Sequence, residues 1–284
     1  MTNEKMRSAD DDGGKTRFID NFPSTSLTKD KIIAICEKPR TCPFALNRLI
    51  HLDPILFGRT QFIYNFFYPD KIHEYVPVAK IITVLHLNTI RNYARQAALN
   101  TPFCDKAALR EEEKQVKRAF VRAYAARLLA ERGGIEAEKL QQYYAAGLLF
   151  DFPNYVSRGK KAQAAEVARY WRFCEVLHDV LVYKDAYKKY SGKYKHVLFT
   201  ALAANYLAEK IIRRTVPAGR KPSPVREASA TRDSGAGRGA AAERGGLDGA
   251  IQKYLGVASG DVHALMPLVT AGLETQLLFL RGEP

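Results

Sequence analysis

Apolar residues recur every three or four positions through most of this chain, and this spacing constrains its fold more than any other feature. The clearest case runs from about Ala107 to Arg132, where apolar positions fall four or seven residues apart until Gly133-Gly134 ends the pattern. A helix buries one face at this spacing, whereas a half-buried strand needs apolar and polar residues in alternation. Convincing alternation is absent from the sequence. The sequence therefore predicts an all-α chain.

Several other segments carry the same helical pattern. Asp53-Pro54 marks one helix start, because aspartate caps a helix and proline suits its first position. Asn88 is expected to cap another helix. Helices are predicted over 28–38, 43–50, 54–67, 88–97, 136–149, 160–190 and 195–213, and 78–85 fits either a helix or a strand.

Two segments lack the pattern and set the expected domain boundaries. Residues 1–22 are polar and acidic, and 216–246 consist largely of Pro, Gly, Ala, Ser and Arg. Neither can bury enough apolar surface to offset the entropy lost on ordering. We therefore expect a disordered leader, one helical domain over 23–215, a disordered basic loop over 216–246, and C-terminal helices over 247–284 that pack on the domain.

The charge and the cysteines limit the classes of protein. The formal net charge is +14, which favours attraction to nucleic acid, anionic lipid or acidic proteins but also serves solubility alone. The four cysteines are scattered without a CxxC pair, as expected of free thiols in a reducing compartment. The first twenty residues lack the apolar core of a signal peptide, and no apolar run reaches the length of a transmembrane segment. A cytoplasmic location is predicted.

The segment GLLFDFP at 147–153 looks like a metal-binding signature that has lost a ligand. A histidine at position 150 would stand directly before Asp151, and imidazole and carboxylate side by side can hold a divalent cation and activate its bound water. The residue present is Phe150, which has no lone pair to offer. The segment cannot bind a metal in this way, so we expect a fold kept for binding or signalling.

Three blocks in order resemble the HD-related output domain (HDOD) family over roughly residues 27–215. The LDPIL segment at 52–56, with Asn65 eleven residues after its proline, is similar to the family's "DP-x-L … N" pattern. VLHL at 84–87 with IRN at 90–92 is similar to "LLG-hydrophobic-x-x-[LV]-[RK]-N", and AAGLLFDF at 145–152 is similar to "x-A-GLLHDIG". The resemblance implies an all-α, multi-helix orthogonal bundle of HDOD or HD-like type.

The resemblance also implies where the related metal-dependent phosphohydrolases keep their ligands. Those positions fall on Arg122, on the pair Phe150 and Asp151, and on Asn205. Asp151 alone is still a ligand type, so no metal, no other cofactor and no catalytic residue is expected. An ion pair between Arg122 and Asp151 is expected instead. HDOD members generally act without catalysis in bacterial signalling, which implies a regulatory module that binds a protein partner.

Two other functions stay open from the sequence. A surviving metal-dependent phosphohydrolase or cyclic-dinucleotide phosphodiesterase would need a different site. The adjacent His178 and Asp179 offer one, with His86, His196 or Asp151 as further donors. Neighbouring side chains on a helix point about 100° apart, which opposes this arrangement.

A charge-driven nucleic-acid binder is the other open function. Tyrosines recur at three- and four-residue intervals over a predicted basic helix at 183–195. Lysines that could contact nucleic acid, a cyclic dinucleotide or another anion lie between them: Lys184, Lys188, Lys189, Lys193 and Lys195. The simpler interpretation is that the tyrosines pack inward while the lysines face solvent.

Overall fold

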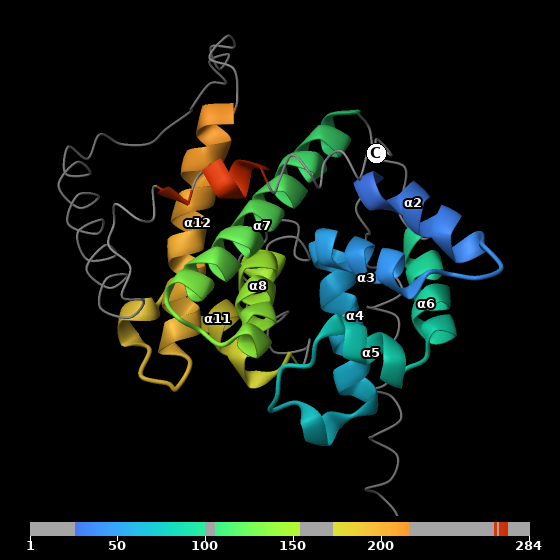
Figure 1. The fold of residues 1–284 in the computed structure, drawn as a ribbon, viewed down its shortest axis with the longest axis horizontal. Coiled ribbons are helices and arrows are strands. Elements are labelled where there is room, and N and C mark those ends of the chain that lie inside the picture. Colours follow the sequence, from blue (N-terminus) through green and yellow to red (C-terminus); the bar gives the residue numbers. More distant parts are fainter. Residues whose placement is uncertain (1–25, 100–105, 154–172, 216–263, 266, 272–284) are drawn as a thin grey trace, which may run out of the picture.

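The computed structural model describes residues 26–99, 106–153, 173–215, 264–265 and 267–271, and these contain helices and no strand. The predicted all-α fold is confirmed. The helices are α2 (Ser26–Glu37), α3 (Pro43–Leu52), α4 (Pro54–Phe67), α5 (Val78–Val84), α6 (Leu87–Leu99), α7 (Lys106–Arg132), α8 (Leu140–Leu149), α11 (Glu175–Tyr183) and α12 (Lys195–Thr215), with the short 3-10 helices η1 (Pro69–Lys71), η2 (Ala137–Lys139) and η3 (Tyr187–Lys189). Figure 1 shows α2 to α6 gathered on one side and α7, α8, α11 and α12 on the other.

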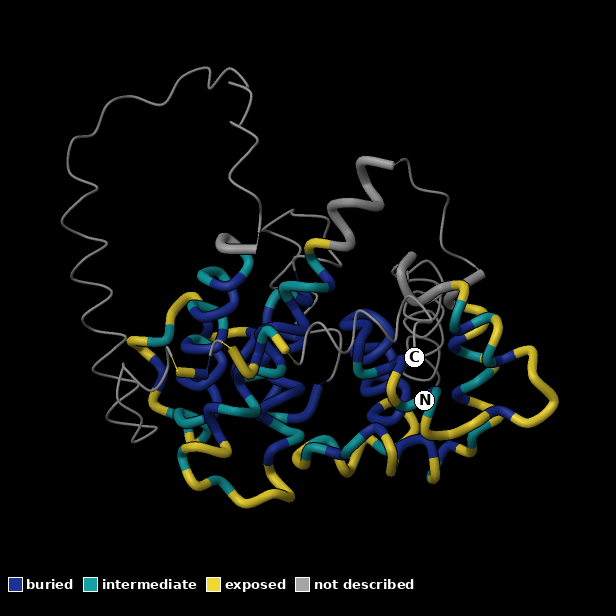
Figure 2. The backbone as a smooth tube through the Cα atoms, turned by 45° about the horizontal axis from the view of Figure 1, so that its top comes forward, coloured by how far each residue is buried: buried dark blue, intermediate teal, exposed yellow. Residues whose placement is uncertain are grey.

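Helix α4 lies inside the molecule and is buried from Pro54 through Asn65 on every face. Asp53 caps it as predicted, since its Oδ1 accepts hydrogen bonds from the backbone N–H of Ile55 at 2.9 Å and of Leu56 at 3.0 Å. Its polar residue Gln61 donates to the carbonyl of Val76 at 2.9 Å. A helix enclosed on all sides must satisfy its polar groups internally, and α4 does so at these positions. Figure 2 shows the dark blue interior and the yellow exposed stretches at the periphery.

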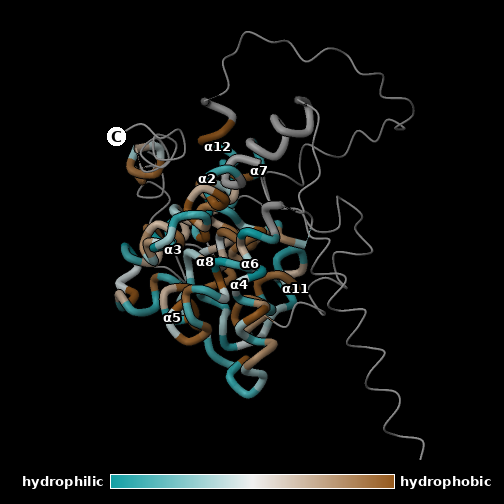
Figure 3. The backbone as a smooth tube through the Cα atoms, turned by 90° about the vertical axis from the view of Figure 1, so that its right-hand side faces the viewer, coloured by the Kyte–Doolittle hydropathy of each residue, from teal (hydrophilic) through white to brown (hydrophobic). Residues whose placement is uncertain are grey.

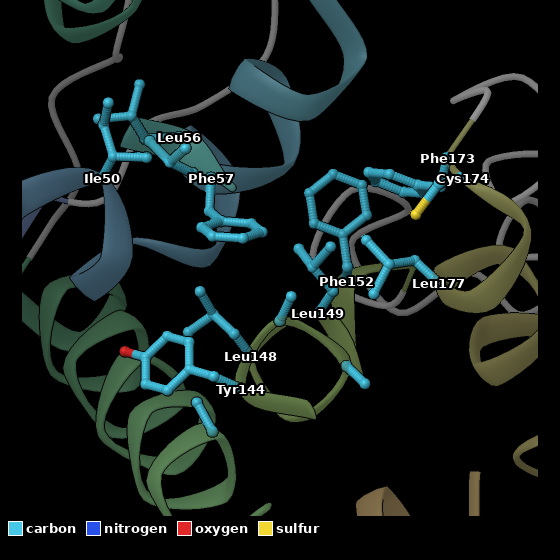
Figure 4. Packing of buried hydrophobic residues seen from close by; sticks show 14 of the residues in the cluster. Ile50, Leu56, Phe57, Tyr144, Leu148, Leu149, Phe152, Phe173, Cys174 and Leu177 are labelled. Atoms are coloured by element: carbon cyan, nitrogen blue, oxygen red, sulfur yellow. The ribbon is translucent and has the colours of Figure 1, made fainter. Parts of the chain in front are cut away.

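Aromatic packing joins the end of α8 to both halves of the molecule. The ring of Phe152 lies 5.3 Å from that of Phe173 in an edge-to-face arrangement. The Phe152 ring also packs against Gly58 of α4, where an added Cβ would lie 2.3 Å from a carbon of that ring. Figure 4 shows Phe152 beside Phe173 and Leu177. The chain directly after α8 is thereby fixed in the core.

A second core lies between α7 and α12. It is built largely from alanine and leucine side chains, among them Ala125, Leu129 and Leu207, and it includes the buried Leu265 and Val269. Small residues let the two helices approach closely, and this approach sets the position of side chains that α7 and α12 direct at each other. Figure 3 shows hydrophobic and hydrophilic stretches alternating along the helices, as amphipathic packing requires.

The structure resolves one open local prediction and corrects two others. The ambiguous segment 78–85 is helix α5. The residue before α6 is His86, whose carbonyl accepts from the N–H of Ile90, so Asn88 lies within the first turn and is not the cap. The single helix expected over 160–190 lies in part within 154–172, outside the described residues. Of the remainder, Phe173 and Cys174 are not helical, and α11 ends at Tyr183.

Most of the expected leader, loop and C-terminal helices, residues 1–22, 216–246 and much of 247–284, lies outside the described residues. Within the part of the chain that is described, no helix combines the length and the apolar content needed to cross a membrane.

Candidate functional site

Helices α7 and α8 approach each other closely at Gly147. A Cβ added there would lie 2.7 Å from the carbonyl oxygen of Arg122 and 2.8 Å from the Cα of Ala123. Only a residue without a side chain fits at these distances. The close approach brings the guanidinium of Arg122 to the end of α8, where its Nε donates to the carbonyl of Gly147 at 3.3 Å.

Arg122 is fully buried and joins three elements of the fold. Its Nη1 donates both to Oδ2 of Asp151, in an ion pair, and to Oδ1 of Asn205 on α12 at 3.1 Å. The structure therefore brings together Arg122, Asp151 and Asn205, and the ion pair expected from the sequence is formed.

Lys184, directly after α11, enters the same site from the opposite side. Its ammonium donates to the backbone carbonyl of Phe150 at 2.9 Å and lies 3.4 Å from Oδ1 of Asp151. It also lies 5.0 Å from the centroid of the Phe150 ring, while the guanidinium carbon of Arg122 lies 5.3 Å from that centroid. Both cations are within the range of a cation–π interaction. Phe150 thus contacts two cations where a histidine would have offered a lone pair.

Two cationic side chains share one carboxylate at the site. Asp151 carries one negative charge, and each of its two oxygens faces a different cationic side chain. Burial by itself raises the pKa of Asp151, but the charges of Arg122 and Lys184 and their hydrogen bonds outweigh burial and hold that pKa below its ordinary value. Removing one member of a buried ion pair costs about 3–5 kcal/mol, so these three residues depend on one another.

The donor set does not fit a catalytic divalent cation. Such an ion needs several carboxylate or imidazole ligands, and the site offers one carboxylate, already bound to two cations, and one amide oxygen that accepts from Arg122. Across the described residues, no three or more His, Cys, Asp or Glu side chains are grouped closely enough to hold a metal.

The alternative pair His178 and Asp179 has a structural role. Oδ2 of Asp179 accepts a hydrogen bond of 2.6 Å from the hydroxyl of Tyr190, and Nδ1 of His178 lies 3.6 Å from the other carboxylate oxygen. The backbone N–H of Tyr194 in turn donates to the Tyr190 hydroxyl at 3.2 Å. This network fixes the chain between α11 and α12.

The predicted basic helix over 183–195 is wrong. Helix α11 ends at Tyr183, a single 3-10 turn follows at Tyr187–Lys189, and α12 begins at Lys195. The chain turns because Tyr190 and Gly192 make a tight loop, in which a Cβ at position 192 would lie 2.4 Å from the Tyr190 hydroxyl oxygen.

Because this segment is not one helix, the five predicted contact lysines lie in different environments. Lys184 is buried in the site, which corrects its assignment as a surface contact. Lys193 pairs with Glu175 at 2.7 Å, and hydrogen bonds from Lys193 and His73 lower the pKa of that carboxyl to about 2. Lys188 and Lys189 are exposed and Lys195 is half-buried.

Sequence reasoning missed the contribution of Lys184 to the site. Its partners Phe150 and Asp151 lie more than thirty residues earlier in the chain. The lysine sits in a run of similar lysines, and nothing in its immediate neighbours distinguishes it from the exposed ones.

No protein-family model and no curated protein matches the sequence. The MmoQ response regulator from Methylococcus capsulatus str. Bath superposes with a TM-score of 0.58 at 17% identity, over 86% of this chain and 97% of that one. A structure of a fragment of the same regulator gives a TM-score of 0.54 at 18% identity, over 72% of this chain and 94% of the fragment.

A third solved structure, described as an HDOD domain protein with unknown function from Geobacter sulfurreducens, matches with a TM-score of 0.35 at 16% identity, over 94% of this chain and 95% of that one. At that TM-score the two chains superpose loosely, so the likeness in fold rests on the MmoQ regulator, whose overall architecture this chain shares.

Proposed function

We propose that this chain is a non-catalytic regulatory module that acts in cytoplasmic signal transduction by binding a protein partner. The observation that carries the proposal is that Asp151 is paired with two cations: one carboxylate oxygen faces Arg122 and the other faces Lys184. Two side-chain cations lie at the position that the sequence resemblance assigns to the ligands of a metal. The charge that a divalent ion would supply comes from the protein itself.

The exchange of ligands for cations supports a structural role for this site. Arg122 ties α7 to the end of α8 and to α12, and Lys184 ties the end of α11 to the same point. The four elements are held in one arrangement, as a rigid binding module requires.

Two histidines that could serve as further ligands or as a general base are engaged elsewhere. Nδ1 of His51 lies 2.8 Å from the carbonyl of Asn47, and Nδ1 of His196 lies 3.0 Å from the hydroxyl of Tyr143. Their contacts support a packing role for both imidazoles, in keeping with a module that does not catalyse a reaction.

The fold likeness fits a regulatory role. The solved structure with the TM-score of 0.58 is described as a response regulator. We infer a related use for this chain, in which surface contact and not turnover transmits the signal.

Metal content and hydrolysis test the proposal. The protein is purified from medium supplemented with manganese and iron, its metal is measured by mass spectrometry, and hydrolysis of bis-p-nitrophenyl phosphate is followed. We expect far less than one ion per chain and no turnover above buffer, because Asp151 is the single anionic donor among the described residues of the site.

A rebuilt site provides the positive control. A variant carrying Arg122→His, Phe150→His, Lys184→Gln and Asn205→Asp restores imidazole and carboxylate donors around Asp151, and metal uptake by this variant shows that the assay detects such a site. Stoichiometric metal with turnover in the unmodified protein would refute the proposal.

Charge-driven nucleic-acid binding is the weaker alternative. Two of the five lysines on which it depended are engaged within the protein, Lys184 with Asp151 and Lys193 with Glu175. The exposed Lys188 and Lys189 still favour an anionic partner, and a comparison of peptide and oligonucleotide binding separates the two classes.

A further inference from the structure

We propose that residues 182–189, which form a ridge between the end of α11 and η3, are the docking surface for an acidic protein segment that also carries apolar side chains. The inference rests on the proposed function and names the chemistry of the partner. Figure 1 shows this connection, coloured yellow to orange, at the edge of the molecule beside the start of α12.

The ridge combines exposed apolar side chains with two exposed lysines, which outnumber its one exposed carboxylate, Asp185. Val182 is 43% exposed and Tyr183 is 36% exposed, although both belong to a helix whose other face is in the core. Lys188 and Lys189 follow within seven residues and are exposed. Short acidic segments with an apolar anchor are recognised by this combination, because the anchor contributes buried area and the lysines attract the carboxylates.

The exposed valine favours a protein over a nucleic acid as the occupant. An aliphatic side chain offers phosphates and bases neither charge nor a stacking face. It gains free energy only by burial against another apolar group. The ridge is therefore better matched to a peptide than to a strand of DNA or RNA.

Internal contacts hold the ridge in one shape before any partner arrives. Lys184 is anchored in the Arg122–Asp151 site through its ammonium. The Tyr187 ring packs edge-to-face on Phe199 of α12 with centroids 5.9 Å apart, and the Tyr183 ring packs 4.9 Å from that of Tyr190. A preorganised surface loses less entropy on binding than a flexible loop.

Lys184 is accordingly a positioning residue and not a contact. It turns inward between two exposed neighbours, Tyr183 and Asp185, and draws the chain against the degenerate site. Loss of catalysis requires only that the metal ligands disappear, and it does not require that cations replace them. The ammonium of Lys184 contributes something further, because it fixes the base of the ridge.

Fluorescence anisotropy with defined probes tests the inference. The probes are a labelled helical peptide of glutamate and leucine, an all-glutamate peptide of the same charge, a single-stranded oligonucleotide of the same charge, and phosphatidylserine vesicles. We expect the full-length chain to bind the glutamate–leucine peptide more tightly than the other three. Lys188→Glu with Lys189→Glu should weaken this binding about tenfold or more, and Val182→Ser should weaken it severalfold.

Lys38→Glu with Lys80→Glu is the matched control. Both lysines are exposed, and the double change alters the net charge equally at a distance from the ridge along the chain. We expect binding within about twofold of the unmodified protein, because exposed charges far from a contact are screened by salt. Lys184→Met should reduce affinity and also lower the free energy of unfolding, because it leaves Asp151 with one cation fewer. Lys188→Glu with Lys189→Glu should reduce affinity with little change in that free energy, and this difference separates a positioning residue from a surface contact.

Equal losses in the ridge and control variants overturn the inference, as does tighter binding of the oligonucleotide or the vesicles. Failure of the proposed function has a different signature. The ridge substitutions leave Asp151 and Arg122 in place. Bound metal with hydrolysis would refute the non-catalytic module, and this outcome does not depend on whether the peptide binds. Absence of peptide binding in a metal-free, inactive protein would refute the ridge alone.

Discussion

His86 holds a backbone conformation that most residues avoid. Its φ is +63°, and among the described residues it is the only one other than glycine with a positive φ. It stands between the end of α5 and the start of α6, and its carbonyl accepts from the N–H groups of Thr89 and Ile90. The HDOD-like pattern carries glycine at this position, and the left-handed turn gives the physical reason.

Replacing this histidine by glycine should therefore stabilise the protein. We expect His86→Gly to raise the free energy of unfolding by about 0.5–1 kcal/mol, since relief of left-handed strain exceeds the added entropy of the unfolded chain. Urea denaturation measures the change. His86→Ala is the control, because alanine keeps the strain while removing the exposed imidazole. An equal gain with alanine would assign the effect to the side chain and contradict the backbone explanation.

At the scale of the elements, the α7–α8 contact decides where the site forms. Gly147 allows the two helices to touch through their backbones, and the register of that contact sets Arg122 opposite Asp151. The end of α8 is fixed by Phe152 in the core. The position of the site is thus a consequence of how two helices pack, and its residues then reinforce the packing.

Gly147→Ala should reverse the usual effect of alanine in a helix. At an exposed helical position this change gains about 1 kcal/mol. Here the new methyl group would lie under 3 Å from the backbone of Arg122 and Ala123. We expect a net loss of about 1–3 kcal/mol in the free energy of unfolding, measured by urea denaturation. A Gly147→Ala variant as stable as the original protein would show that the helices separate freely.

For the whole molecule, three buried or half-buried groups among the described residues contribute to a loss of stability in acid. Burial lowers the pKa of His51 and of His196 from the ordinary 6.5, the former despite a backbone hydrogen bond to Asn47. In Asp151 the neighbouring cations overcome burial and lower the pKa from 3.8. In all three cases the unfolded chain binds protons at a higher pH than the folded protein does, so acid favours unfolding.

Stability should fall in two steps as the pH drops. The histidine contribution is complete above 6.5 and is lost as the pH falls below it, and the Asp151 contribution is complete above 3.8 and is lost below that value. Urea midpoints measured across this range test both steps. His51→Gln with His196→Gln should flatten the first step. Asp151→Asn should reduce the second, to which Glu175 also contributes because its pKa is lowered to about 2. Unchanged slopes in these variants would assign the pH dependence to other groups.

The amino-acid sequence alone determined the all-α class, several of the helices and three members of the site. Apolar spacing fixed the all-α class and the bounds of α7, and Asp53 with Pro54 fixed the start of α4, because these signals act within a few residues. Resemblance to a known pattern singled out Arg122, Asp151 and Asn205, although they come from separate elements.

Tertiary structure decided the rest. Whether Lys184 faces solvent or Asp151 depends on where the chain turns after α11, and that turn is set by the packing of Tyr190 against Tyr183 and by its hydrogen bond to Asp179. The left-handed turn at His86 likewise follows from the positions of α5 and α6. Local spacing describes which face of a helix is apolar, but the path between helices is fixed by contacts with distant residues.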